Sequence, residues 1–100
     1  MSYNIVLKEE ADSELCNLSN REKLLVFKQL KKISASPELG QLLGHKAGYD
    51  LSGCRKMYAD KKRIRIVYTI VEEQIVVEII AIGKRDELEV YKLANERLNQ

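Results

Sequence analysis

The residues best suited to chemistry are cations that gather in the second half of the chain. The segment from 54 to 65 carries six basic residues and one acid, whereas charges elsewhere are close to balanced. The six are Arg55, Lys56, Lys61, Lys62, Arg63 and Arg65, and the acid is Asp60. Such a segment is typical of an electropositive strand–turn–strand surface that binds phosphate groups. The alternative is a solvated edge hairpin, whose turn lysines only discourage pairing with another strand.

Arg65 is the cation of this segment that is hardest to explain as a solvated surface residue. It lies in the middle of an expected strand, between Ile64 and Ile66. An outward arginine there either reaches into a groove or pairs with a neighbour, and Glu78 on the adjacent strand is one candidate partner. The sequence therefore predicts Arg65 at a phosphate-binding groove, with an ion pair to Glu78 as the alternative.

A second cationic feature is Gly83-Lys84-Arg85, at the junction of an expected strand and an expected helix. A helix N-terminus presents unpaired N–H groups and a partial positive charge, so anions bind there readily. An arginine beside it can hold phosphate through two parallel hydrogen bonds. Because the end of this strand can border the same groove as Arg65, we expect one shared anion site.

Tyr91 is a third candidate, less than two helical turns after Arg85. A tyrosine on a helix is by default a core residue, but this ring can also border the cationic groove. There it would stack on a base or accept a proton, since neighbouring cations lower the pKa of a phenol. The chain has no acidic dyad, serine elbow or glycine-rich phosphate loop, and its one histidine, His45, falls in a glycine-rich segment. Any catalysis is expected to use cations and hydroxyl groups.

Length and composition restrict the class of protein. One hundred residues are enough for one domain, residues 1–100. The charges, 17 Lys+Arg against 15 Asp+Glu, exclude a disordered polyelectrolyte and a histone-like polycation. Charges interrupt every apolar stretch, and neither a membrane span nor a signal peptide is predicted. Cys16, Cys54 and His45 fit no metal-ligand spacing. We expect a cytoplasmic protein without a metal or another cofactor.

The hydrophobic period predicts a strand and two helices in the first third of the chain. The strand covers residues 3–7, the first helix covers 9–18, and the second lies between Asn20 and Ser34. The apolar stripe of the second helix comprises Leu24, Leu25, Phe27, Leu30 and Ile33. The short connection between the helices predicts an antiparallel helical hairpin.

The period changes from 3.6 to 2 beyond residue 53. The segment 34–53, with Pro37 and four glycines, is typical of a loop. Strands are predicted at 54–59, 63–71 and 75–82, joined by short turns, and a last helix begins at the capping sequence Asp86–Glu89. The expected class is α+β, with helices on one face of a twisted antiparallel sheet.

The motifs of the C-terminal half are similar to those of a known family. The stretch Arg63-Ile64-Arg65-Ile66-Val67-Tyr68, then Ile82-Gly83-Lys84-Arg85 and Val90-Tyr91, resembles the RelE/ParE superfamily of bacterial type II toxins. The order of strands and helices agrees along the whole chain. The resemblance implies the small RelE fold, similar to microbial ribonucleases, with an N-terminal helical hairpin and a C-terminal helix.

Within the superfamily, the RelE-like branch cleaves messenger RNA in the ribosomal A site, whereas the ParE-like branch inhibits DNA gyrase and lacks the nuclease residues. The motif arginines of the nuclease branch fall on Arg65 and Arg85, and its tyrosine falls on Tyr91, which favours that branch. RelE members place two basic residues on alternate positions of the first motif strand, whereas Arg55 and Lys56 are adjacent here and must diverge. The resemblance also implies a cognate antitoxin, docked on the N-terminal helices and the basic groove.

These observations together predict an mRNA interferase, a metal-independent endoribonuclease that uses the ribose 2′-hydroxyl as nucleophile. Arg85 would neutralise the phosphoryl oxygens, Arg65 the leaving-group charge, and Tyr91 or a groove lysine would move the proton. The predicted RNA-binding residues are Arg55, Lys56, Lys61, Lys62, Arg63 and Lys84. Two alternatives remain: a gyrase-inhibiting toxin of the ParE branch, and a relative that only binds RNA or a protein.

Overall fold

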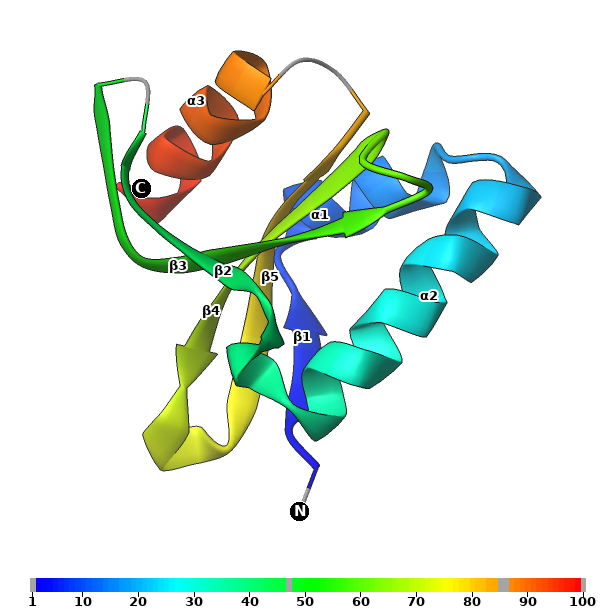
Figure 1. Cartoon of the computed structure of the whole chain (residues 1–100), viewed down its shortest axis with the longest axis horizontal. Coiled ribbons are helices and arrows are strands. Elements are labelled where there is room, and N and C mark those ends of the chain that lie inside the picture. The colour runs from blue at the N-terminus through cyan, green and yellow to red at the C-terminus, as the bar shows by residue number, and fades with distance from the viewer. Residues whose placement is uncertain (1, 47, 85–86, 100) are drawn as a thin grey trace.

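The computed structural model of the chain describes residues 2–46, 48–84 and 87–99, and leaves out the side chains of 87 and 88 (Figure 1). The elements in chain order are β1 (Asn4–Leu7), α1 (Glu9–Cys16), α2 (Asn20–Ala35), the short 3₁₀ helix η1 (Pro37–Leu39), β2 (Gln41–Lys46), β3 (Tyr49–Ala59), β4 (Ile64–Val71), the short 3₁₀ helix η2 (Glu72–Gln74), β5 (Val76–Gly83) and α3 (Glu87–Leu98). This arrangement confirms the predicted α+β class and the predicted strands and helices. None of the described helices has the length and apolar character needed to cross a membrane.

The described strands form a single five-stranded sheet in the order β1-β5-β4-β3-β2. Strand β1 runs parallel to β5, and the other neighbouring strands pair antiparallel. The prediction of a purely antiparallel sheet is therefore wrong at one edge. A parallel pair needs a long crossover connection, and the helices and strands between β1 and β5 supply it.

The segment 34–53 is not the predicted loop, because it contains β2 and the first half of β3. Its strand character is hidden by glycines at 40, 44, 48 and 53, which interrupt the alternation of apolar and polar side chains. Gly44 and Gly53 have φ angles of 63° and 84°, a left-handed conformation that favours glycine. Backbone pairing with β3 and the burial of Leu43 and Leu51 hold the segment in the sheet.

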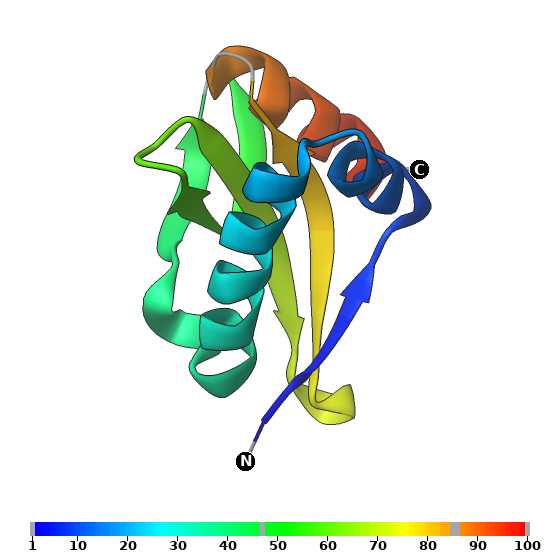
Figure 2. The same cartoon turned by 90° about the vertical axis from the view of Figure 1, so that its right-hand side faces the viewer.

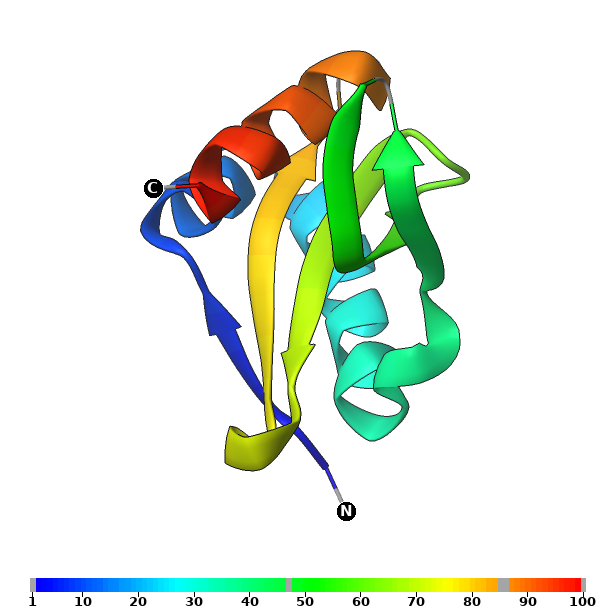
Figure 3. The same ribbon diagram turned by 90° about the vertical axis from the view of Figure 1, so that its left-hand side faces the viewer.

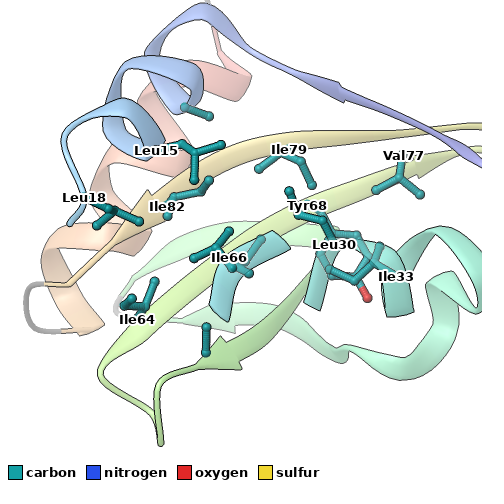
Figure 4. Packing of buried hydrophobic residues seen from close by; sticks show 13 residues of the cluster. Leu15, Leu18, Leu30, Ile33, Ile64, Ile66, Tyr68, Val77, Ile79 and Ile82 are labelled. Atoms are coloured by element: carbon teal, nitrogen blue, oxygen red, sulfur yellow. The ribbon is translucent and has the colours of Figure 1, made fainter. Parts of the chain in front are cut away.

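The helices cover both faces of the sheet, which corrects the prediction that they share one face. Helices α1 and α2 lie on one face (Figure 2), and α3 lies on the other (Figure 3). The side chains between the sheet and the first two helices form the larger core, whose packing is drawn in Figure 4. A second cluster under α3 includes Val67, Val90, Tyr91 and Ala94.

A β-bulge in β5 allows one strand to supply both cores. Val67 of β4 pairs with Ala81 and the next residue, Tyr68, pairs with Ile79, so Ile80 is the extra residue. The bulge places two consecutive residues, Ile80 and Ala81, in the cluster under α3. The residues on either side of them, Ile79 and Ile82, lie in the larger core.

Helix α2 begins with a capping box and buries only part of its predicted apolar stripe. The Ser19 backbone N–H donates to Glu22 Oε1 (2.9 Å), and the Glu22 N–H donates to Ser19 Oγ (3.2 Å). The helix buries Val26, Leu30 and Ile33. The predicted stripe members Leu24 and Phe27 are instead 66% and 47% exposed. The apolar residues of α2 cover more than one side, and only one side contacts the sheet.

Candidate active site

Three neighbouring strands place Tyr58, Arg65 and Gly83 in one row across the sheet. Tyr58 of β3 is the cross-strand partner of Arg65 of β4, and Arg65 is in turn the partner of Gly83 at the end of β5. Directly paired residues project from the same face of a sheet. The chain that continues from Gly83 into Lys84 therefore starts beside Arg65.

The Tyr58 ring is surrounded by cationic side chains from three segments. Lys56, two residues earlier on the same strand face, donates a hydrogen bond from Nζ to the Tyr58 hydroxyl at 2.9 Å. The Lys56 Nζ lies 4.9 Å from the centroid of the Tyr58 ring, Arg65 Cζ lies at 5.4 Å, and Lys62 Nζ lies at 5.8 Å. These distances are within the range of cation–π attraction.

This charge environment changes the acidity of the Tyr58 phenol. The hydrogen bond from Lys56 lowers the pKa of Tyr58, and Arg65 acts in the same direction. Partial burial opposes the shift but does not overcome it. The physical cause is that neighbouring positive charge and hydrogen-bond donors stabilise the phenolate relative to the phenol.

Lys56 and Arg55 diverge, as the adjacent positions require, and the structure shows which of them reaches Tyr58. The Lys56 side chain is on the Tyr58 face and is only 8% exposed. Arg55 instead donates from Nη1 to the backbone carbonyls of Glu38 (3.1 Å) and Gly40 (2.8 Å). Arg55 thus fastens the η1 segment to β3, and its contact with RNA stays a prediction.

The turn that carries Lys62 has an unusual backbone and is held by an ion pair. Asp60, Lys61 and Lys62 have φ angles of 52°, 54° and 75°. The left-handed conformation costs about 1–2 kcal/mol for a residue other than glycine. The guanidinium of Arg21 on α2 contacts both carboxylate oxygens of Asp60 (3.3 and 3.0 Å) and holds the pKa of Asp60 below its usual range. Lys61, Lys62 and Arg63 are exposed.

The junction of β5 and α3 requires a glycine and carries the second cationic feature. A Cβ on Gly83 would lie 2.6 Å from Cγ2 of Val90, so only glycine lets α3 pack this closely on the strand end. The Lys84 Nζ lies 3.3 Å from both carboxylate oxygens of Glu22, an exposed ion pair to the N-terminus of α2. Arg85 and the predicted cap Asp86 lie outside the described residues.

Of the two positions expected for Tyr91, the core and the groove, the structure places its ring in the core. Its side chain is only 2% exposed and packs with Val67, Cys54 and Ala94 in the cluster under α3. It shares the side of the sheet that carries Lys56, Tyr58 and Arg65, but its ring is covered instead of bordering an open groove. The apolar stripe of α3 packs on the sheet and takes Tyr91 with it. Its role in cleavage stays a prediction.

The alternative partner of Arg65, Glu78, is not beside it. Glu78 pairs with Thr69, whereas the cross-strand neighbours of Arg65 are Tyr58 and Gly83. The short turn between β4 and β5 already fixes the Glu78–Thr69 pair, and the β-bulge beyond it only moves the partner of Arg65 from Ile82 to Gly83.

A pocket of about 420 Å³ adjoins the Lys56–Tyr58 pair. It is lined by Gln29, Lys32, Leu39, Gln41, Lys56, Met57 and Tyr58. Gln29 of α2 donates to the backbone carbonyl of Tyr58 at 2.6 Å, which fixes β3 against the helix. The lining thus combines two amide side chains, two lysines, two apolar side chains and Tyr58.

Tyr58 is not among the site residues predicted from sequence, although a signal for it is present. Lys56 and Tyr58 occupy alternate positions of one strand, and alternate positions share a face. Across the turn at 60–63, the hairpin register brings that face to Arg65. The described residues contain no cluster of three or more His, Cys, Asp or Glu side chains that is arranged to hold a metal ion.

No family model matches the chain, but individual proteins do. A RelE-like toxin protein of Escherichia coli is 32% identical over 98% of this chain and 99% of its own length. The mRNA interferase toxin RelE of E. coli K12 is 30% identical with the same coverage.

Solved structures give the same result at the level of the fold. A free-state variant of E. coli RelE with two arginines changed to alanine matches with a TM-score of 0.79 and 29% identity over 98% of this chain and 99% of that one. The toxin in the intact E. coli RelBE toxin–antitoxin complex matches with a TM-score of 0.71 and 26% identity, over 86% of this chain and 100% of that one. Because a RelE-like toxin is 32% identical over almost the full length of both chains, this chain belongs to the RelE family of toxins.

Proposed function

We propose that this chain is an mRNA interferase, the toxin of a type II toxin–antitoxin system, and that it cleaves translated messenger RNA in the ribosomal A site. The observation that carries the proposal is the cluster of Lys56, Tyr58 and Arg65 beside Gly83. The 30% identity to an E. coli mRNA interferase over almost the whole chain supports the same activity.

The proposed chemistry is attack of a ribose 2′-hydroxyl on the adjacent phosphorus, with no metal ion required. The oxygens of the phosphorane and the leaving 5′-oxygen carry negative charge that the protein must stabilise. We assign Arg85 to the phosphoryl oxygens and Arg65 to the leaving-group charge. Losing one such positioned donor typically costs about 2.7–4 kcal/mol, or roughly 10²–10³ in rate.

The exposed turn after β3 is the proposed contact with the RNA backbone. Lys61, Lys62 and Arg63 project there without burial, and the Arg21–Asp60 ion pair keeps the turn in place. Contacts between cations and phosphates position a nucleic acid without reading its sequence. Lys84, which pairs with Glu22, is expected to contribute only after that exposed pair opens.

The ribosome has a physical role in this proposal. A site whose described part is built from cations and a phenol lacks a histidine that titrates near neutral pH. Such a catalyst gains from a partner that presents the message already bent and oriented, because orientation removes much of the entropic barrier.

A cognate antitoxin is the second proposed partner, and α2 offers it a surface. Leu24 and Phe27 are exposed on this helix, and Lys28 and Lys31 are exposed beside them. An amphipathic segment with acidic flanks would bury the two apolar side chains and pair with the lysines.

Primer extension on a translated message tests the proposal. The wild-type toxin is expected to produce cuts with codon periodicity, and Arg85→Ala is expected to fold normally and to lose most of the cutting and the growth arrest. Lys31→Ala, a cation on the outer side of α2, serves as the control and should cut as the wild type does. DNA damage without cuts would identify a gyrase-directed toxin and reject the proposal.

A further inference from the structure

The described tyrosines differ in what their hydroxyl groups meet. Tyr68 is fully buried. Its hydroxyl donates to the Pro37 carbonyl and accepts from the Gly40 N–H. Tyr91 is covered by the cluster under α3, and Tyr3 precedes β1 at the opposite edge of the sheet. Tyr58 is partly exposed, and its hydroxyl accepts a hydrogen bond from an ammonium group.

The charged side chains that are seen to contact the Tyr58 ring are cations. Lys56 comes from the same strand, Arg65 from β4 and Lys62 from the turn between them. These positive charges favour the phenolate over the phenol, and Lys56 and then Arg65 lower the pKa of Tyr58.

We propose that Tyr58 is the general base of the cleavage reaction. This inference rests on the proposed function and names a residue for the proton transfer. The phenolate oxygen of Tyr58 takes the proton of the 2′-hydroxyl, and the 2′-oxygen forms a bond to the adjacent phosphorus. The P–O5′ bond breaks with its electron pair on O5′, which takes a proton from solvent water. The products are a 2′,3′-cyclic phosphate and a 5′-hydroxyl, and Tyr58 then releases its proton to solvent.

The lysine at this place is less suited to the same task. An ammonium group has three donors and no lone pair, so Lys56 accepts a proton only after losing one. The charged ammonium group of Lys56 instead donates a hydrogen bond to the Tyr58 oxygen, and this bond stabilises the phenolate. Lys56 is therefore a positioning residue for Tyr58.

The decisive variant is Tyr58→Phe, which removes one oxygen and keeps the ring. Loss of a general base typically costs about 10²–10⁴ in rate, so we expect that drop in single-turnover cleavage of ribosome-bound message. If the ring only stacks on a base, phenylalanine does the same and the rate stays near wild type, which would overturn the inference. Tyr3→Phe, the same change at the far edge of the sheet, is the matched control and should cut at the wild-type rate.

A fluorinated tyrosine at position 58 gives a readout that a structural role would not move. Its phenol is more acidic, so the rise of the cleavage rate with pH is expected at lower pH than in the wild type. The same substitution at position 3 should leave the profile in place. An unshifted profile for position 58 would contradict the inference, even if Tyr58→Phe failed to fold. A wild-type protein that cuts no message would instead reject the proposed function.

Discussion

Glu14 of α1 and Arg97 of α3 form a two-pronged ion pair that joins the helices of opposite faces past β5. The distances are 2.7 Å from Nη1 to Oε1 and 3.1 Å from Nη2 to Oε2. The same Arg97 Nη1 donates to the carbonyl of Ile80 at 2.9 Å, and Glu14 Oε1 accepts from the N–H of Ile82 at 3.0 Å. The pair therefore holds the bulged part of β5 that precedes Gly83.

Removing Arg97 should strongly destabilise the protein. Arg97 is 8% exposed, and Arg97→Ala leaves Glu14 without its cation and the Ile80 carbonyl without this donor. Breaking one side of a buried pair costs about 3–5 kcal/mol, and we expect the lower end because Glu14 keeps partial access to water. Urea unfolding measures the loss. Lys84→Ala, which breaks the exposed pair with Glu22, should leave the midpoint unchanged.

The Tyr68 hydroxyl should matter for stability and not for cleavage. It donates to the Pro37 carbonyl at 2.7 Å and accepts from the Gly40 N–H at 2.9 Å, in a fully buried position. Tyr68→Phe leaves two buried backbone groups unpaired, which is expected to cost about 1–3 kcal/mol of unfolding free energy. Thermal unfolding and the cleavage rate of the folded protein test this together. A stable variant with lost cleavage would contradict the assignment.

The two cysteines should differ in reactivity. Cys16 is exposed, whereas Cys54 is 0% exposed and burial raises the pKa of its thiol to about 11. Since the thiolate is the reactive form, a thiol reagent at neutral pH should label Cys16 at once and Cys54 only on unfolding. Rapid labelling of two thiols in the native protein would show that the cluster under α3 opens readily.

The same thiol makes the stability depend on pH in the alkaline range. The folded pKa of Cys54 lies above the unfolded value of about 8.5, so its contribution is complete below that value and is lost as the pH rises toward 11. Wild-type protein should therefore lose unfolding free energy across this interval more steeply than Cys54→Ala. Parallel curves for the two proteins would contradict this.

Arg65 and Arg63 offer a matched pair for separating chemistry from binding. Arg65 faces Tyr58 from the second position of β4, and Arg63 is exposed in the turn two residues earlier. Arg65→Ala should lower the cleavage rate at saturating ribosome concentration by about 10²–10³, and Arg65→Lys should recover only part, because lysine lacks the planar fork. Arg63→Ala should raise KM with kcat unchanged. Equal effects of the two alanine variants on kcat would contradict the distinction.

The hairpin that carries the site was predictable from sequence, because its strands alternate cleanly. Ile64, Ile66 and Tyr68 lie in the larger core as their spacing predicts, which sends Arg65 to the other face. The position of Tyr58 depends on the register across the turn. Three residues other than glycine adopt positive φ in that turn, a conformation that composition does not indicate.

Other features depended on contacts between distant segments. Leu24 and Phe27 are exposed, whereas Val26 and Leu30 are buried, because only one side of α2 contacts the sheet. The helix sequence has apolar residues on both sides and does not indicate which side that is. The bulge at Ile80 changes which residue faces Arg65, and it is held by Arg97, seventeen residues away along the chain. The sequence left both a core and a groove position open for Tyr91, because packing of α3, and not its distance from Arg85, decides its exposure.

The most direct test of the active site is a structure of the toxin on a ribosome whose message carries a 2′-O-methyl group at the cleavage position, so that it binds and is not cut. We predict that the scissile phosphate lies within hydrogen-bond distance of the Arg65 and Arg85 guanidinium groups, with the Tyr58 hydroxyl facing the methylated 2′-oxygen. A phosphate bound at another face of the sheet, away from Tyr58 and Arg65, would contradict the account.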